Sequence, residues 1–317
     1  MSPERYTVLH ETRYAYTAPV SQSWQLARLT PRMLPWQRLL SHSVQIDPPA
    51  DERRDELDSF GNMVTHFGLH GAHRMLRVKM ECLVEVMPRP SLDSGAPMQT
   101  QSLGSMTQMS QTQVQGPALT PMSWEAVRDA IRREPQQDDL VPASMCEPTP
   151  LVPLSEGARQ YASKSFTRAR PWLEAVSELT RRIHEDFEFE PGATTVSTSV
   201  DEVLYQRSGV CQDFAHLMLA CLRGLALPAR YVSGYLLTDP PPGMPRLMGV
   251  DASHAWVAAY SPQHGWVEFD PTNNQLADTR YITLTWGADF ADVVPLRGVI
   301  FGGGEQQMDV EVSVMPA

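Results

Sequence analysis

The sequence predicts an α+β protein in which a β-rich region comes first and a segment of helices and strands follows. Apolar and aromatic residues alternate with polar ones over Tyr6–Tyr16 and again over Leu76–Val86, which is typical of half-buried antiparallel strands. After Cys211, apolar residues recur at helical spacing, and two short apolar runs follow as a candidate hairpin. These three observations predict the fold class.

Composition and periodicity divide the chain into four expected segments. Residues 1–90 should form an antiparallel β domain, and residues 91–153 should form a low-complexity and Pro-rich linker. The first part of that linker, 91–122, is polar and aperiodic, so it has too little apolar area to offset its ordering entropy. Residues 154–290 should form the core, and residues 291–317 should add a C-terminal strand extension.

The motif GVCQDFAH at residues 209–216 marks the start of a predicted helix. Apolar residues recur from Phe214 to Leu225 at helical spacing, and the preceding residues are loop-like, so Cys211 falls in the first turn. Unpaired N–H groups and a partial positive charge at a helix N-terminus favour a thiolate. An inert buried thiol is the alternative, because it is the usual state of a free cysteine.

Two predicted strands follow this helix. The run SHAWVAAY at residues 253–260 carries His254 near its start, and the run GWVEFD at residues 265–270 ends in Asp270. A short turn joins them, so a hairpin would set His254 and Asp270 side by side. Taken singly, His254 is also compatible with core packing and Asp270 with turn formation. Their order after Cys211 favours a nucleophile, a base and an orienting carboxylate.

A cysteine on a helix, a histidine on the next strand and an aspartate on the strand after resemble the transglutaminase-like branch of the papain-like cysteine enzymes. The runs GVCQDFAH, HAW and FDPTNN are similar to those of the bacterial transglutaminase-like family. Residues 1–90 also resemble the β-rich N-terminal region of these proteins. The resemblance implies a papain-like core in which the helix bearing Cys211 packs on an antiparallel sheet bearing His254 and Asp270.

The activity implied by the resemblance is acyl transfer through a thioester on Cys211. His254 would hold the thiolate as an ion pair, and Asp270 would accept the second ring N–H of His254. The backbone N–H of Cys211 is the expected first oxyanion donor, whereas Trp172, the nearest upstream tryptophan, is not assigned as the second.

The expected partner is a peptide or protein that offers an amide group, with water or a lysine amine as the acyl acceptor. Water would make the protein a peptidase or amidase, and a lysine amine would make it a protein-glutamine transferase. Hydrolysis is favoured, since most lysines are protonated near neutral pH and no calcium-binding loop or other switch is recognisable. A catalytically silent binding or scaffold protein with the same fold is the alternative from another class.

Composition excludes several classes of partner. The net charge of −11 argues against nucleic acid and anionic membranes, which need a positive field. No signal peptide or membrane span is expected, and the sparse cysteines fit a reducing compartment, so a cytoplasmic location is predicted. No cofactor is expected. A zinc site built from Cys211, His216 and His254 would lack the paired ligand spacing of such sites, so no metal is expected either.

Other residues near the motifs are expected to play supporting roles. Asp213 should cap or salt-bridge the start of the cysteine helix, and His216 should pack behind it. Trp256 and Trp266 should pack in the core. The Pro-rich loop at 239–249 is expected to border the substrate cleft.

Overall fold

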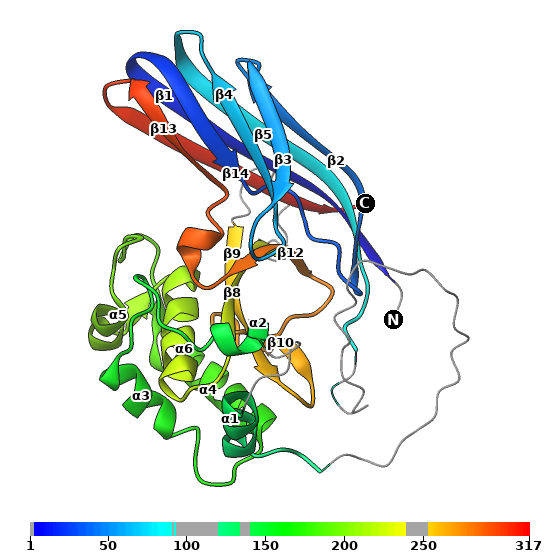
Figure 1. Ribbon diagram of the computed structural model, residues 1–317, viewed down its shortest axis with the longest axis vertical. Coiled ribbons are helices and arrows are strands. Elements are labelled where there is room, and N and C mark those ends of the chain that lie inside the picture. The colour runs from blue at the N-terminus through cyan, green and yellow to red at the C-terminus, as the bar shows by residue number, and fades with distance from the viewer. Residues whose placement is uncertain (1–2, 91, 93–119, 134–139, 239–252) are drawn as a thin grey trace, which may run out of the picture. The chain divides into compact units, whose positions relative to one another are not determined.

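The structure is a computed structural model that describes residues 3–90, 92, 120–133, 140–238 and 253–317 (Figure 1). Most of the polar segment 91–122 and all of the loop 239–249 lie outside the described residues. The predicted α+β class is confirmed. The chain divides into two compact units, the first spanning Met1–Arg89, Val232–Ala255 and Ala277–Ala317 and the second spanning Pro90–Tyr231 and Trp256–Leu276.

A seven-stranded antiparallel sheet forms most of the first unit (Figure 1). The first half of the long strand β1 pairs with β5 and β14, and its second half pairs with β4 and β13. The final strand of the sequence therefore lies beside the first one. The seven strands are β1 (Glu4–Ala27), β2 (Gln37–Asp47), β3 (Glu52–Leu57), β4 (Met63–Leu69), β5 (His73–Val86), β13 (Leu296–Gly302) and β14 (Gln306–Pro316).

One face of this sheet carries the core of the first unit. The alternating apolar residues of β5 from Leu76 to Val86 are all at most 2% exposed, which confirms the alternation predicted from the sequence. Val312 and Val314 of β14 pair with His10 and Val8 of β1 and extend the same buried face. Complete burial of each such aliphatic side chain stabilises the fold by about 1.5–3 kcal/mol.

His10 is a buried polar residue in this core. Its Nδ1 lies 2.8 Å from the hydroxyl of Tyr235, and its Nε2 lies 3.3 Å from Oγ1 of Thr12. Burial lowers the pKa of His10 from 6.5 to about 4. The unfolded chain keeps the ordinary pKa, so it binds a proton at a higher pH than the folded chain does. The neutral, buried His10 therefore contributes fully to stability above its pKa in the unfolded chain. This contribution is lost as the pH falls toward its pKa in the folded chain.

We expect the free energy of unfolding to fall by about 2 kcal/mol as the pH is lowered from 7 to 5, because the unfolded chain protonates His10 more readily than the folded chain does. Denaturant titrations at the two pH values measure this difference. His10→Gln should destabilise the protein at pH 7 and remove this part of the pH dependence. His70→Gln is the control, since the His70 side chain is 42% exposed, and it should leave the dependence intact. A His10→Gln variant with the full wild-type pH dependence would show that another group carries it.

A second, five-stranded sheet has the strand order β11-β10-β9-β8-β12. Strands β9 and β10 form the predicted antiparallel hairpin, with Tyr260 opposite Trp266 and Val257 opposite Phe269. The division between the two units runs through this sheet. Its strands are β8 (Ala229–Leu236), β9 (Ser253–Ser261), β10 (Gly265–Asp270), β11 (Gln275–Leu276) and β12 (Tyr281–Gly287).

Helix α6 of the second unit is buried from Asp213 to Arg223 and contacts α3, α4 and α5. Its sequence is apolar on nearly every side, which is typical of a helix inside a domain. The other helices of this unit begin near residues 124, 140, 156, 172 and 200. The bounds are α1 (Trp124–Arg132), α2 (Leu140–Ser144), α3 (Glu156–Ser163), α4 (Trp172–Asp186), α5 (Val200–Gln206) and α6 (Cys211–Gly224), with the short strands β6 (Glu188–Phe189) and β7 (Ser208–Gly209). A 3-10 turn (Phe290–Asp292) belongs to the first unit.

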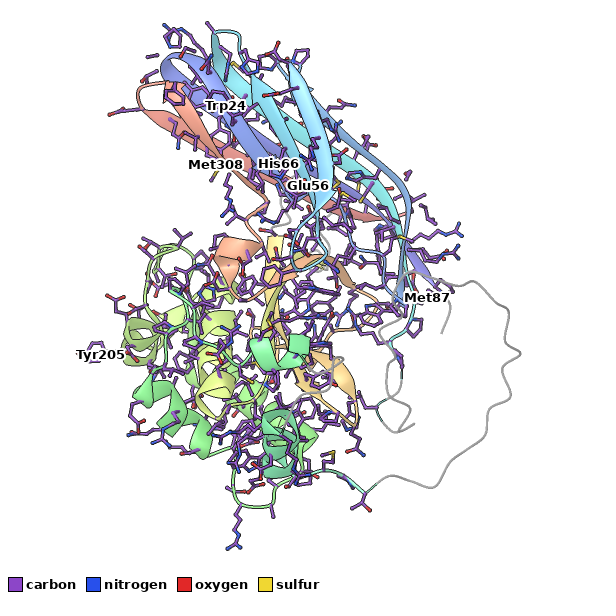
Figure 2. All side chains as sticks on the ribbon, in the orientation of Figure 1. Trp24, Glu56, His66, Met87, Tyr205 and Met308 are labelled. Carbon is purple, nitrogen blue, oxygen red and sulfur yellow. The ribbon has the colours of Figure 1, made fainter. Side chains whose placement is uncertain are left out.

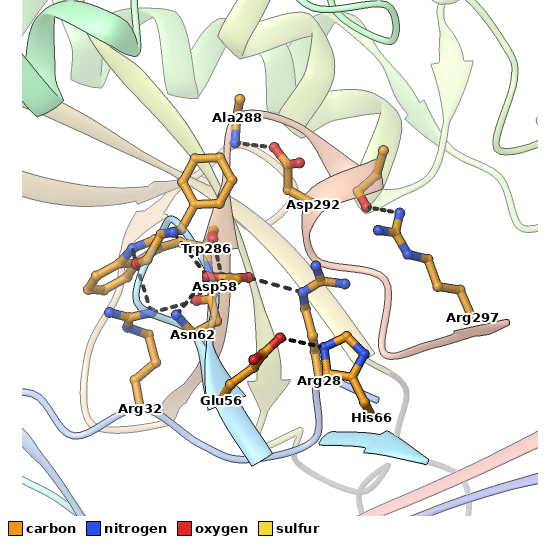
Figure 3. Close-up of polar contacts among 12 residues, drawn as sticks. Arg28, Arg32, Glu56, Asp58, Asn62, His66, Trp286, Ala288, Asp292 and Arg297 are labelled. Atoms are coloured by element: carbon orange, nitrogen blue, oxygen red, sulfur yellow. Dashed lines mark hydrogen bonds and ion pairs between the residues drawn. The ribbon is translucent and has the colours of Figure 1, made fainter. Parts of the chain in front are cut away.

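Two buried side-chain amides of the β-rich region hold strand β12. Asn62 accepts a bond from the backbone N–H of Trp286 at 3.0 Å and donates to its carbonyl at 2.8 Å (Figure 3). Gln37 makes the same pair of bonds to the backbone of Thr283, at 2.8 and 2.7 Å. Each amide takes the place of a neighbouring strand and satisfies backbone groups of β12 along an edge where none of the described strands pairs.

Candidate active site

Cys211 is the first residue of α6 and is only partly buried. The two residues of β7 precede it closely, and they pair in parallel with β6, where Phe189 lies opposite Gly209. Val210 is extended and forms the N-cap. The predicted position of Cys211 in the first turn of a helix is therefore confirmed, and this position favours the thiolate form of a cysteine.

Asp213 fixes the backbone just before the cysteine. Its Oδ2 accepts a hydrogen bond from the backbone N–H of Val210 at 2.8 Å and another from the hydroxyl of Thr194 at 2.6 Å. A Cβ on Gly209 would lie 2.9 Å from this side chain, so the close approach requires a glycine there. Burial raises the pKa of Asp213. The capping role predicted for Asp213 is confirmed.

His254 is the second residue of β9 and is partly buried. Within its own unit, its ring packs against Tyr281 of β12, with the ring centroids 6.2 Å apart. A buried aromatic neighbour restricts the rotamers of an imidazole and thereby limits the directions in which its nitrogens can point.

Asp270 is the last residue of β10 and is completely buried. Its Oδ1 accepts bonds from the backbone N–H groups of Thr272 and Asn273, at 2.8 and 3.2 Å. Its Oδ2 accepts from the side-chain amide of Asn273 at 2.7 Å. These bonds close a turn after β10, so Asp270 does have the turn-forming role that the sequence left open. Each carboxylate oxygen can accept more than one bond, and the three contacts leave capacity for a further donor.

The other three cysteines differ from Cys211 in their surroundings. Burial raises the pKa of Cys82 to about 12 and that of Cys146 to about 11. Cys221 is fully buried, which raises the pKa of its thiol strongly, and its Sγ donates to the carbonyl of Ala158 at 3.3 Å. A thiol whose pKa is raised holds little thiolate at neutral pH, and the thiolate is the nucleophile.

Limited treatment with iodoacetamide at pH 7.5 should therefore alkylate Cys211 before the other three cysteines. Peptide mapping by mass spectrometry identifies the modified residue. Cys146 is the internal control, because it is also only partly buried but has a raised pKa. Labelling of Cys146 ahead of Cys211 would overturn the assignment of the activated thiol.

The supporting residues predicted from the sequence lie in the core. His216 is 4% exposed, and its ring lies 5.2 Å from that of Tyr231 in β8, so α6 packs on this sheet through it. Trp256 and Trp266 are at most 8% exposed, which confirms core packing. Trp172 is buried and lies against His264 and Phe269, at 5.9 and 6.1 Å between ring centroids.

Among the described residues, no group of three or more His, Cys, Asp and Glu side chains is arranged to hold a metal ion. No helix in the described part of the chain is both long and apolar enough to span a membrane.

Strand β6 was not predicted from the sequence. The run Phe187-Glu188-Phe189-Glu190 alternates apolar and acidic residues, which is the pattern of a strand and was the available signal. The run is short and directly follows a long helix, and short apolar alternations are ambiguous in that setting.

Proteins of known family share both parts of this architecture. Residues 6–85 match the bacterial transglutaminase-like N-terminal region, and residues 159–271 match the transglutaminase-like superfamily. A crystal structure of a Cytophaga hutchinsonii protein, described as a candidate cysteine protease, matches with a TM-score of 0.70 at 18% identity. It covers 100% of this chain and 92% of that one, so the two proteins share a fold. The predicted transglutaminase-like core is thereby confirmed.

Proteins related in sequence identify the family of the chain. An uncharacterized protein of Mycobacterium tuberculosis is 41% identical over 321 residues, which cover 98% of this chain and 93% of that protein. A protein-glutamine gamma-glutamyltransferase of Pseudomonas aeruginosa is 37% identical over 108 residues, which cover 33% of this chain and 16% of that protein. The chain belongs to the bacterial transglutaminase-like family.

Proposed function

We propose that the protein is a cysteine-dependent enzyme that transfers the acyl group of an amide, with Cys211 as nucleophile, His254 as base and Asp270 as the residue that orients the base. The observation that carries the proposal is the position of Cys211 at the start of the buried helix α6, followed in order by the two strands of a hairpin that bear His254 and Asp270. The segment that matches the transglutaminase-like superfamily, 159–271, contains all three residues.

The register of the hairpin supports the pairing of His254 with Asp270. Ala258 lies opposite Glu268, and residues opposite each other in an antiparallel pair project from the same face. Side chains alternate along a strand with a period of two residues. His254 has the parity of Ala258 and Asp270 has that of Glu268, so both side chains belong to one face of the hairpin.

The proposed reaction proceeds in two steps through a thioester. The thiolate of Cys211 attacks the amide carbonyl, and the backbone N–H of Cys211 stabilises the oxyanion. His254 donates its proton to the leaving amine as the carbon–nitrogen bond breaks. A water molecule then gives a proton to His254 and attacks the thioester, which releases the carboxylic acid and restores the thiolate of Cys211 beside a protonated His254. Asp270 would hold the imidazole in the tautomer that both steps need.

Water is the proposed acceptor, which makes the enzyme a peptidase or amidase that acts on a peptide or protein. Most lysine side chains are protonated near neutral pH and must lose a proton before they can act as acyl acceptors. Water can enter the site as a neutral molecule without this prior step. Transfer to an amine is the second candidate, because the Pseudomonas aeruginosa relative is a glutamyltransferase by name. The cytoplasmic location stays a prediction.

Incubation with glutamine-containing peptides and a primary-amine probe separates these outcomes. Mass spectrometry should show amide cleavage, either of the side chain or of the peptide bond, without incorporation of the probe. Incorporation of the probe at a rate that depends on Cys211 would identify a transferase. No conversion of a broad peptide library, with Cys211 intact, would favour a silent binding or scaffold protein.

A further inference from the structure

Phe189 is an exposed aromatic residue beside the proposed nucleophile. It lies in β6, which is the outer strand of a two-stranded parallel ladder whose inner strand, β7, leads directly into Cys211. The residue is 51% exposed. Phe189 is opposite Gly209, two residues before the cysteine.

The distance between Phe189 and Cys211 suits an extended peptide. Neighbouring strands lie about 4.8 Å apart, and a strand rises about 3.3 Å per residue, so the two Cα atoms are separated by at most about 12 Å. An extended chain covers that distance in about three or four residues. The next few residues of an extended substrate whose amide lies at Cys211 can therefore reach Phe189.

The backbone of β6 offers an unpaired edge. The N–H groups of Glu188 and Glu190 donate to the carbonyls of Arg207 and Gly209, each at 2.9 Å. Backbone groups alternate in direction along a strand, so the N–H and C=O of Phe189 face the opposite edge. In the described part of the chain, no strand pairs with that edge. An exposed strand edge is a template for the addition of a further strand.

The ring of Phe189 is held in place as well as exposed. Its centroid lies 6.5 Å from the ring of Phe214 in α6, and Phe214 also packs against Phe187 at 6.0 Å. The ring is thus in contact with the helix that carries the cysteine, while about half of the residue's surface is open. A fixed, exposed aromatic surface binds an apolar side chain at little entropic cost.

We propose that an extended peptide substrate adds as a strand along the free edge of β6 and places a large apolar side chain on Phe189, two to four residues from the reactive amide. This inference rests on the proposed function and names its substrate class. Main-chain bonds to Phe189 hold the peptide in register, and the ring selects the apolar residue.

The test compares two glutamine peptides that differ only in a leucine or an alanine within this window. The wild-type protein should favour the leucine peptide by about tenfold in kcat/KM. Phe189→Ala should reduce that ratio to near one. It should leave turnover of a short glutamine amide without flanking residues unchanged, which also reports correct folding. Phe189→Leu should retain most of the preference.

Tyr205→Ala is the matched control, because Tyr205 is an exposed aromatic residue of the same unit, 91% exposed and projecting from α5 (Figure 2). It should keep the full preference. A Phe189→Ala variant that turns over both peptides with the wild-type ratio would overturn the inference and leave the proposed function standing. A wild-type protein with no turnover of any amide would overturn both.

The pairing of the substrate backbone has its own readout. Methylation of a single amide nitrogen in the leucine peptide, scanned from the second to the fourth residue away, should lower kcat/KM sharply at one position. Uniform tolerance of methylation at all three positions would show that the peptide does not add as a strand.

Discussion

Cys211→Ala should lose all amide turnover above the uncatalysed rate while its fold stays intact. Removal of the nucleophile from a comparable catalytic triad lowers kcat by about a million-fold. Cys211 is only partly buried and starts a helix, where alanine fits well, so little stability should be lost. Peptide turnover and the unfolding midpoint of the same preparation measure the two effects.

Cys146→Ala is the matched control for this variant. Cys146 is also partly buried, but burial raises the pKa of its thiol to about 11. Its replacement should leave turnover within about twofold, since loss of an inert thiol changes only local packing. Equal loss of activity in both variants, or full activity in Cys211→Ala, would remove Cys211 from the proposed reaction.

Asp270→Asn should lower kcat by about 10,000-fold, because the amide would stabilise the wrong tautomer of His254. The asparagine Oδ1 can keep the bonds from the N–H groups of Thr272 and Asn273, whereas the bond that Oδ2 accepts from the Asn273 side-chain amide is lost. The stability should therefore fall by only about 1 kcal/mol. Steady-state kinetics and denaturant titration measure the two quantities.

Asn273→Ala separates the turn from the chemistry. It removes the same side-chain bond to Asp270, 2.7 Å long, but leaves the carboxylate in place. Its stability should fall by an amount similar to that of Asp270→Asn, while kcat should stay near the wild-type value. Parallel losses of kcat in the two variants would assign Asp270 to turn formation alone.

The fold could be predicted from the sequence where local periodicity determines structure. Helix α6, the β9–β10 hairpin and the buried face of β5 each repeat apolar residues with the period of their element. The pairing of β13 and β14 with the first strand was not predictable in this way. It joins residues more than 300 positions apart, such as Val8 and Val314, and periodicity says which face is buried but not which strand lies alongside.

The same limit applies to individual polar residues. Nothing in the local pattern marks Gln37 or Asn62, yet their amides hold the backbone of β12 over large sequence separations. By contrast, the capping role of Asp213 was predictable, because its partner Val210 lies three residues away on the same chain segment.

The candidate site contains residues that a local pattern marks and residues whose role depends on distant parts of the chain. The order of Cys211, His254 and Asp270 was available from three short motifs with local signatures. The second oxyanion donor could not be predicted from the sequence, because its identity depends on which distant side chain faces the cysteine. No local pattern marks Phe189, because its proximity to Cys211 comes from pairing with Gly209, twenty residues further along the chain.

The most direct test of the account is to trap the acyl-enzyme. The protein is mixed with a saturating glutamine peptide, quenched in acid within milliseconds to seconds, digested and analysed by mass spectrometry. The account predicts an adduct on Cys211 whose mass equals that of the transferred acyl group, formed and consumed at rates that match turnover, and absent from Cys211→Ala. Turnover at a measurable rate with no adduct on Cys211, or with an adduct on another residue, would contradict the proposal that this cysteine carries the acyl group.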